Sequence, residues 1–146
     1  MTNGALSPRA SGRRRHPSAS RAAPATEAQL HRAVAQYLNV ALPSDCWWTT
    51  FPSGGGGKVR GAQLKAMGLK AGVPDILIVR DSLGTFPAVI WIELKRVSGA
   101  ASIAQKLCHA ELNQRDMPVA ICRSIPDVQE TLIGWGIVKA WKGRGG

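Results

Sequence analysis

The stretch VIWIELKR, residues 89–96, begins with apolar residues and ends in charged ones. Its first four residues are β-branched or aromatic, which is typical of a strand inside a sheet. Side chains alternate between the two faces of a strand, so Trp91, Glu93 and Lys95 share one face. The sequence therefore predicts a core strand whose end presents a carboxylate and an ammonium group on the same face.

A second apolar strand precedes this one at hairpin distance. Residues 75–80 (DILIVR) and 88–95 are separated by DSLGTFP, whose glycine and proline are typical of a turn. An antiparallel hairpin without a bulge, turning about Gly84, places Asp75 opposite Glu93. Directly opposed side chains share a face, with Cβ atoms about 4.5–5.5 Å apart. The two carboxylates therefore repel each other unless positive charge lies between them.

A hard divalent cation is one source of that positive charge. Mg²⁺ prefers a few carboxylate oxygens together with water and substrate phosphate. It lowers the pKa of bound water and neutralises charge on a phosphate under attack. Lys95, on the same face, can orient that water or stabilise the developing negative charge. The arrangement favours a phosphodiesterase site, and the alternative is a Glu93–Lys95 surface ion pair that contributes about 0–1 kcal/mol.

The charge balance of the chain favours an anionic partner. Nineteen Lys and Arg residues against nine Asp and Glu residues give a net charge of +10. Nucleic acid is the usual partner of such a chain, although a basic tail on a neutral domain gives the same balance. Residues 46–74 contain no acidic residue, so we expect this stretch to contact phosphate, with a flexible linker as the alternative. The basic residues that we expect to contact nucleic acid are Lys58, Arg60, Lys65, Lys70 and Arg96.

The N-terminal residues 1–25 differ in composition from the rest of the chain. They hold five arginines and no acidic residue, with few large apolar side chains. Such a segment buries too little apolar surface to fold, so we expect a disordered basic tail followed by one domain over residues 26–146. The tail either adds phosphate attraction or is a dispensable extension.

The remaining periodicity predicts an α/β protein with a mixed β-sheet flanked by helices, in the order α-β-β-β-α-β-α-β. Thr26 is expected to cap the first helix, and Gly68 to end a short helix over 61–67. The helix over 102–115 carries Ile103, Leu107 and Ala110 on one side. The other expected elements are helices over 27–40 and 126–134 and strands over 46–51, 119–122 and 137–141.

The location of the protein follows from what the chain lacks. No apolar run approaches the ~20 residues needed to cross a bilayer. The arginines near the N-terminus are not followed by the apolar segment of a secretory signal. The three cysteines suit neither a disulfide framework nor a zinc site. We therefore expect a cytoplasmic protein without a membrane partner.

Three segments taken together resemble a known nuclease superfamily. GVPDILIV (72–79), WIELKR (91–96) and Gln105 on the next helix resemble the PD-(D/E)xK nucleases. Within that superfamily the chain is similar to the virus-type replication-repair nuclease (VRR-NUC) domain in its short, stand-alone form. The likeness covers about residues 26–141 and implies a restriction-endonuclease-like core.

The resemblance implies a role for each matching residue. Asp75 and Glu93 would be metal ligands together with the backbone carbonyl of Leu94, and the ion would be Mg²⁺ or Mn²⁺. Lys95 would be the catalytic lysine.

Two further positions match the family less specifically. Glu27 would be the acid of the first helix that completes the metal site, and its alternative is a helix N-terminal charge. Gln105 would steady the site or contact phosphate, and its alternative is a surface glutamine.

The chain departs from the family pattern after the second long helix. Glycine is frequent there, whereas this sequence has Gln114 to Met117 before Pro118. Outside the motifs, His31 and His109 are interpreted as ordinary histidines rather than general bases. The tryptophans of the strands are interpreted as core residues rather than base-stacking residues.

These observations predict a Mg²⁺- or Mn²⁺-dependent DNA endonuclease. The resemblance implies a homodimer that acts on branched DNA such as Holliday junctions. One alternative is a non-specific or nicking DNase, and another is a non-catalytic basic module that only binds nucleic acid.

Overall fold

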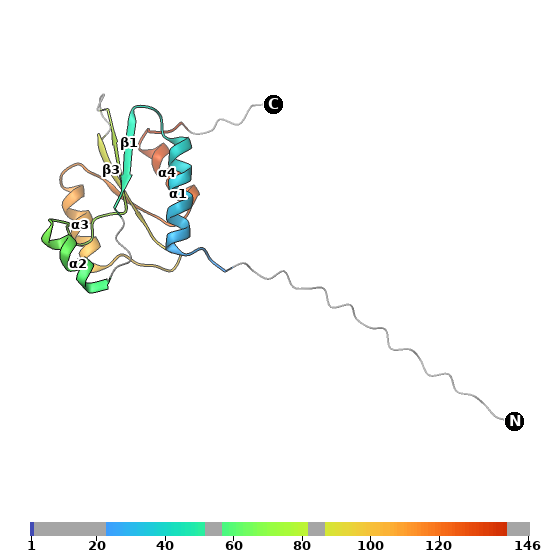
Figure 1. Ribbon diagram of the computed structural model, residues 1–146. Helices are drawn as coiled ribbons and strands as arrows, with labels where there is room; N and C mark the ends of the chain where they lie inside the picture. The colour runs from blue at the N-terminus through green and yellow to red at the C-terminus, as the bar shows by residue number, and fades with distance from the viewer. Residues whose placement is uncertain (2–22, 52–56, 82–86, 140–146) are drawn as a thin grey trace.

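The computed structural model describes residue 1 and residues 23–51, 57–81 and 87–139. Within them the chain forms a three-layer α/β/α domain in which a central sheet has helices on both faces (Figure 1). None of the described helices is long and apolar enough to span a membrane. The elements are α1 (Glu27–Ala41), β1 (Cys46–Thr50), α2 (Gly57–Ala66), β2 (Ile76–Arg80), β3 (Val89–Leu94), α3 (Ile103–Asn113), β4 (Val119–Cys122) and α4 (Ile125–Gly134).

The sheet has four strands in the order β1-β2-β3-β4. The first three are antiparallel, and β4 runs parallel to β3, which makes the sheet mixed as expected. Ile76 pairs with Ile92 and Leu77 with Trp91. This register is that of the bulge-free hairpin, and its continuation by one residue sets Asp75 opposite Glu93. Gly84, about which the hairpin was expected to turn, lies outside the described residues.

One face of the sheet carries the apolar core. The side chains of β2 and β3 on this face are entirely or almost entirely buried, and they pack against α1 and α4. Alternation along the strands puts five branched residues on this one face. These core residues are Ile76, Ile78, Ile90, Ile92 and Leu94 from the sheet and Val34, Leu38, Val128 and Leu132 from the two helices.

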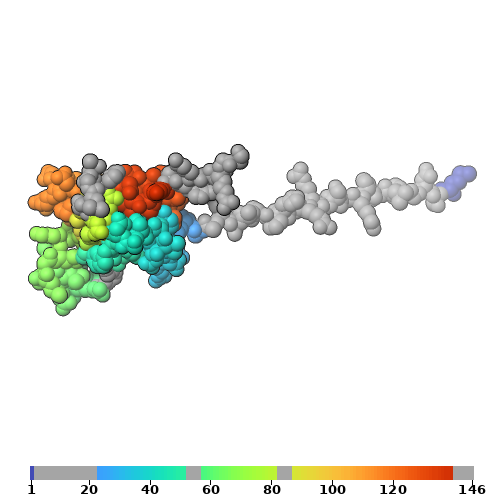
Figure 2. Space-filling view, turned by 90° about the horizontal axis from the view of Figure 1, so that it is seen from above, coloured from blue at the N-terminus to red at the C-terminus, as the bar shows by residue number. Residues whose placement is uncertain are grey.

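The opposite face carries Glu93 and Lys95 together with apolar residues such as Leu77 and Trp91, and α3 and α2 lie on this side of the sheet (Figure 1). Trp91, Glu93 and Lys95 alternate with the core residues along β3 and therefore point to this side. In the space-filling view α2 (green) and α3 (orange) lie beside each other at one end of the domain (Figure 2). The side of α3 that carries Ile103 and Leu107 faces solvent, with these side chains 78% and 63% exposed.

Side-chain caps fix where the long helices begin. Thr26 caps α1 as expected, in a reciprocal capping box with Gln29. Ser102 and Gln105 form the same arrangement at the start of α3. Ser124 accepts a hydrogen bond from the backbone N–H of Asp127 at the start of α4.

The element order differs from the expected one at two points. The helix expected over 61–67 begins earlier, at Gly57, so α2 is a full element between β1 and β2. The strand expected over 137–141 is wrong for residues 137–139, and residues 140 and 141 lie outside the described residues. Gly136 has φ +68°, and the N–H of Ile137 donates to the carbonyl of Leu132. The N–H of Ile137 therefore serves the end of α4, which prevents a strand from starting there.

The end of α3 is closed without glycine. Asp116 has φ +56°, the only positive φ of a non-glycine residue in the described part of the chain. The N–H of Met117 donates to the carbonyl of Leu112 at 3.1 Å. Aspartate tolerates this left-handed conformation better than most residues, so the departure from the family pattern leaves the helix end intact.

Candidate active site

Two charged side chains are buried where β3 ends. Glu93 is 1% exposed and Lys95 is 8% exposed, although such residues are rarely buried. The Nζ atom of Lys95 lies 2.8 Å from Oε1 of Glu93. The two residues do form an ion pair, but it is a buried pair rather than the surface pair of the alternative interpretation. Burying two charges costs several kcal/mol of desolvation, which is typical of a functional site.

Asp75 joins this pair from the neighbouring strand. It directly precedes β2, follows the buried Pro74, and is 6% exposed. Its Oδ2 atom accepts a hydrogen bond from the backbone N–H of Leu94 at 2.8 Å. The carboxylate is therefore fixed against the end of β3, beside Glu93.

Gln105 reaches the same carboxylate from α3. Its Oε1 atom accepts the backbone N–H of Ser102 at 2.8 Å in the capping box. Its Nε2 atom donates to Oε1 of Glu93 at 2.5 Å. The cap thus orients the amide so that its donor points at Glu93, and Gln105 is not a free surface residue.

His109 is also part of this cluster, although the sequence interpretation assigned it no role. It lies one turn after Gln105 on α3, is 8% exposed, and its Nε2 atom is 3.7 Å from Oε2 of Glu93. The sequence did contain a signal for this position. His109 follows Gln105 by four residues, and residues four apart on a helix lie on one face. His31, the other histidine considered as a general base, lies half-buried on α1.

The electrostatics of the cluster centre on Glu93. Burial raises the pKa of this carboxyl from 4.5 to about 6, while the neighbouring Lys95 opposes the rise. The charges of Asp75 and Glu27 raise the pKa of Glu93 further. Burial, and then the charge of Lys95, lower the pKa of His109, so its imidazole is neutral at pH 7.

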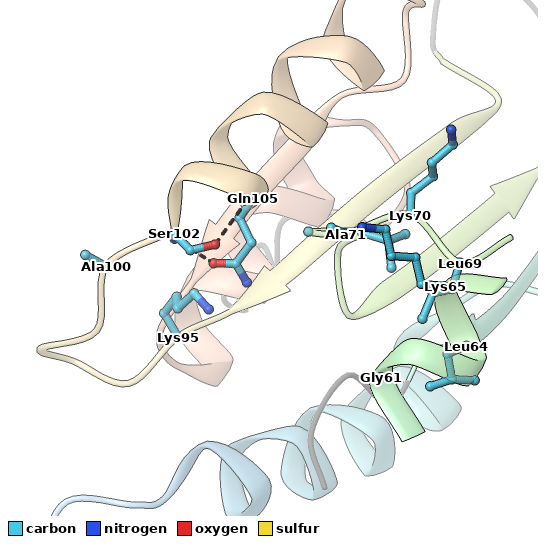
Figure 3. Close-up of a pocket in the computed structure, with 12 residues that line it drawn as sticks. Gly61, Leu64, Lys65, Leu69, Lys70, Ala71, Lys95, Ala100, Ser102 and Gln105 are labelled. Atoms are coloured by element: carbon cyan, nitrogen blue, oxygen red, sulfur yellow. Dashed lines mark hydrogen bonds between the residues drawn. The ribbon is translucent and has the colours of Figure 1, made fainter. Parts of the chain in front are cut away.

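A pocket of about 500 Å³ opens beside the buried pair, between α2 with its following turn and the start of α3 (Figure 3). Lys95 and Gln105 lie on one side of the pocket, and Lys65 and Lys70 come from the other (Figure 3). Two of the expected basic residues therefore line the pocket, although the side chain of Lys70 extends away from Lys95 (Figure 3).

The other expected basic residues lie apart from the lining of the pocket. Lys58 and Arg60 are exposed on α2, and Arg96 is exposed directly after Lys95. None of the three lines the pocket.

A comparison with protein families identifies the domain. The model of the VRR-NUC domain matches residues 17–126. The chain belongs to the VRR-NUC family. The match begins inside the expected tail, nine residues before the expected domain start, and includes all the buried residues of the cluster.

A solved structure supports the same assignment of the fold. A VRR-NUC domain protein superposes with a TM-score of 0.62 at 21% sequence identity, over 77% of this chain and 89% of the other. The expected mixed sheet between helices is therefore confirmed. No curated protein matches the chain.

The acidic residues of this VRR-NUC domain offer oxygen ligands to a divalent ion. Oε2 of Glu93 is buried and has no hydrogen-bond partner, so it can accept a cation. No group of three His, Cys, Asp or Glu residues gathers in a metal-binding arrangement within 23–51, 57–81 and 87–139. Two carboxylates are nonetheless sufficient for Mg²⁺, which keeps several waters and takes substrate phosphate as ligand. The donor set fits such an ion.

Glu27 stands apart from the other acids. It is exposed in the first turn of α1, and its influence on the site is the long-range rise in the pKa of Glu93. Glu27 therefore occupies the position of its alternative role, a negative charge at the N-terminus of a helix.

Proposed function

We propose that the protein is a metal-dependent DNA endonuclease that hydrolyses phosphodiester bonds. One observation carries this proposal: the buried carboxylate of Glu93, beside Asp75, is held by Lys95 and Gln105 at the edge of a basic pocket. A buried cluster of charged groups costs folding free energy and is therefore typical of a functional site, and the pocket gives a phosphate backbone access to it.

In this proposal each residue has a defined task. Asp75, Glu93 and the backbone carbonyl of Leu94 hold a Mg²⁺ or Mn²⁺ ion, with Glu27 as a more distant acid. When bound, the ion activates water and neutralises charge on the scissile phosphate. Gln105 keeps Glu93 in one orientation.

Lys95 acts on the reacting phosphate. Its ammonium group stabilises the negative charge that develops on the phosphate oxygens as water adds to phosphorus and the bond to the sugar oxygen breaks. The proton lost by the attacking water goes to solvent, and the leaving sugar oxygen takes up a proton from solvent. The basic residues Lys65 and Lys70 hold flanking phosphates in the pocket, and Lys58, Arg60 and Arg96 hold phosphates farther along the strand.

The experiment that tests this function is a gel cleavage assay on a labelled four-way junction and a linear duplex of matched sequence. Each substrate is incubated with Mg²⁺, Mn²⁺ or EDTA. We expect cleavage with the metals, none with EDTA, and a loss of at least about 100-fold in Lys95→Ala. Lys139→Ala is the matched control, because Lys139 is exposed and follows α4, which packs on the core face of the sheet rather than beside the pocket. Full activity of Lys95→Ala would remove this lysine from the mechanism.

The same assay separates the candidate substrates. We propose selective cleavage of the junction, because a symmetric homodimer with one site per strand suits two-strand cleavage of branched DNA. Equal cleavage of both substrates would identify a non-specific or nicking DNase instead. Metal-independent binding of DNA without cleavage, unchanged in Glu93→Gln, would favour a non-catalytic binding module. Light scattering at micromolar concentration tests the dimer, and a monomer contradicts it.

A further inference from the structure

Two buried polar atoms face each other in the site, and neither has a hydrogen-bond partner. They are Nε2 of His109 and Oε2 of Glu93, which lie 3.7 Å apart. This separation exceeds the usual length of an N–H···O hydrogen bond, so a hydrogen bond between the two atoms requires one of the side chains to move closer. Leaving a buried donor and acceptor unpaired costs about 1–3 kcal/mol each, so the arrangement requires an explanation.

The other oxygen of Glu93 is already held. Oε1 lies 2.8 Å from Nζ of Lys95 and accepts the amide donor of Gln105. Gln105 and His109 project from the same side of α3, one helical turn apart, so the helix presents one donor to each oxygen of the carboxylate.

We infer that His109 is a positioning residue that donates its Nε2–H to Oε2 of Glu93 and thereby fixes the plane of this carboxylate for a divalent ion. The neutral imidazole supplies one N–H donor. A carboxylate oxygen has two lone-pair directions, so Oε2 can accept this hydrogen bond and still bind a cation. Such outer partners of a ligating carboxylate orient it and tune its affinity for metal.

This inference rests on the proposed function, because it gives His109 a task only if Glu93 binds a metal ion. It differs from general-base catalysis, since His109 acts through Glu93 and touches neither water nor phosphate. It also differs from a packing role. If His109 only filled space, a side chain of similar size could replace it without any change in metal affinity.

The test measures Mn²⁺ binding by isothermal titration calorimetry on the full chain, with the thermal unfolding midpoint as a check of folding. His109→Gln keeps an N–H donor near the position of Nε2, whereas His109→Leu fills the space without a donor. We expect the affinity for Mn²⁺ to fall about 10- to 100-fold in the leucine variant. We expect the glutamine variant to stay within a few-fold of the wild type. His31→Leu, on α1 outside the cluster, is the matched control.

The possible outcomes are distinct. If the wild type binds no Mn²⁺, both the proposed metal-dependent function and this inference fail. If the wild type and the leucine variant bind Mn²⁺ equally, the inference fails while the proposed function stands. If glutamine loses as much affinity as leucine, the hydrogen-bond donor is not what matters and the inference is overturned. A loss in leucine with recovery in glutamine supports it.

Discussion

At the scale of single residues, the site is organised around one carboxylate. Glu93 is the most deeply buried charged residue among those described, and the groups that surround it come from three different parts of the chain. Asp75 comes from the neighbouring strand, Lys95 from the same strand, and Gln105 from α3. Because its pKa is raised to about 6, Glu93 makes the stability of the protein depend on pH.

The first prediction compares the wild type with Glu93→Gln in EDTA. The folded-state pKa of Glu93, about 6, lies above its ordinary value of 4.5. Between these values the unfolded chain releases the proton before the folded chain does, so wild-type stability falls as pH rises through this window. Relative to the wild type, Glu93→Gln should therefore gain about 2 kcal/mol in free energy of unfolding between pH 4 and pH 7.

Urea denaturation at a series of pH values measures this difference. The comparison cancels the contributions of titrating groups that lie far from Glu93, because they are common to both proteins. A difference that stays constant across the window, or that changes in the opposite direction, would contradict the raised pKa.

At the scale of elements, the cluster around Glu93 depends on how closely the turn before β2 approaches α3. Gly72 has φ +79°, and a Cβ atom there would overlap the carbonyl of Ala104 and the backbone nitrogen of Gln105. The absence of a side chain at Gly72 thus allows the backbone of the turn to contact the backbone of α3. This approach places the start of α3 where Gln105 reaches Glu93.

The second prediction concerns Gly72→Ala. The methyl group should push the start of α3 away from the turn, so cleavage should fall about tenfold or more and stability should fall as well. Gly68→Ala is the matched control, because Gly68 has φ +99° but no atom within 4 Å of the added Cβ. The Gly68→Ala variant has the backbone strain without the clash. Its free energy of unfolding should therefore fall by about 1–2 kcal/mol, while its cleavage activity is retained. Equal loss of cleavage in both variants would show that the contact with α3 is not required.

The third prediction concerns the end of α3. The φ of +56° at Asp116 causes steric strain that glycine would avoid. Asp116→Gly should raise the free energy of unfolding by about 0.5–1 kcal/mol, whereas Asp116→Ala should lower it. Thermal unfolding of the two variants checks the opposite signs, and a stabilised alanine variant would refute this account.

At the scale of the whole molecule, the basic pocket and the apolar core lie in different places. The basic stretch that leads into Pro74 forms α2 and one side of the pocket, beside α3 and at one end of the domain (Figure 2). The apolar core lies on the other face of the sheet, under α1 and α4. Phosphate should therefore bind at one end of the molecule.

The fourth prediction concerns the salt dependence of DNA binding in EDTA. Each lysine that contacts phosphate releases a counterion, so the slope of log affinity against log salt should become shallower by about 0.9 for each lysine removed. Lys65→Ala and Lys70→Ala should each show this change on duplex DNA, and Lys139→Ala should not. Fluorescence anisotropy at several salt concentrations measures the slopes. Unchanged slopes in both pocket variants would place the DNA elsewhere.

Local features of the sequence were sufficient to predict the hairpin and most helix starts. The alternation of isoleucines with polar or aromatic residues fixes both faces of β3, and the register expected for a bulge-free hairpin is the one observed. The serine and threonine caps define the helix starts because their hydrogen bonds lie within four residues. The strand expected over 137–141 was wrong at residues 137–139 because the closure of α4 uses the N–H of Ile137.

The sequence by itself therefore determined the hairpin and the presence of Glu93 and Lys95 on one face, because these follow from local periodicity. The position of Asp75 opposite Glu93 depended on the absence of a bulge, which the register of the folded hairpin shows. Only the tertiary structure decided which side of α3 is inward. Its apolar residues Ile103 and Leu107 face solvent, and His109 is buried against Glu93. Periodicity shows that a helix has two sides, but the surface on which it docks determines which side is buried. Here that surface is the polar end of β3.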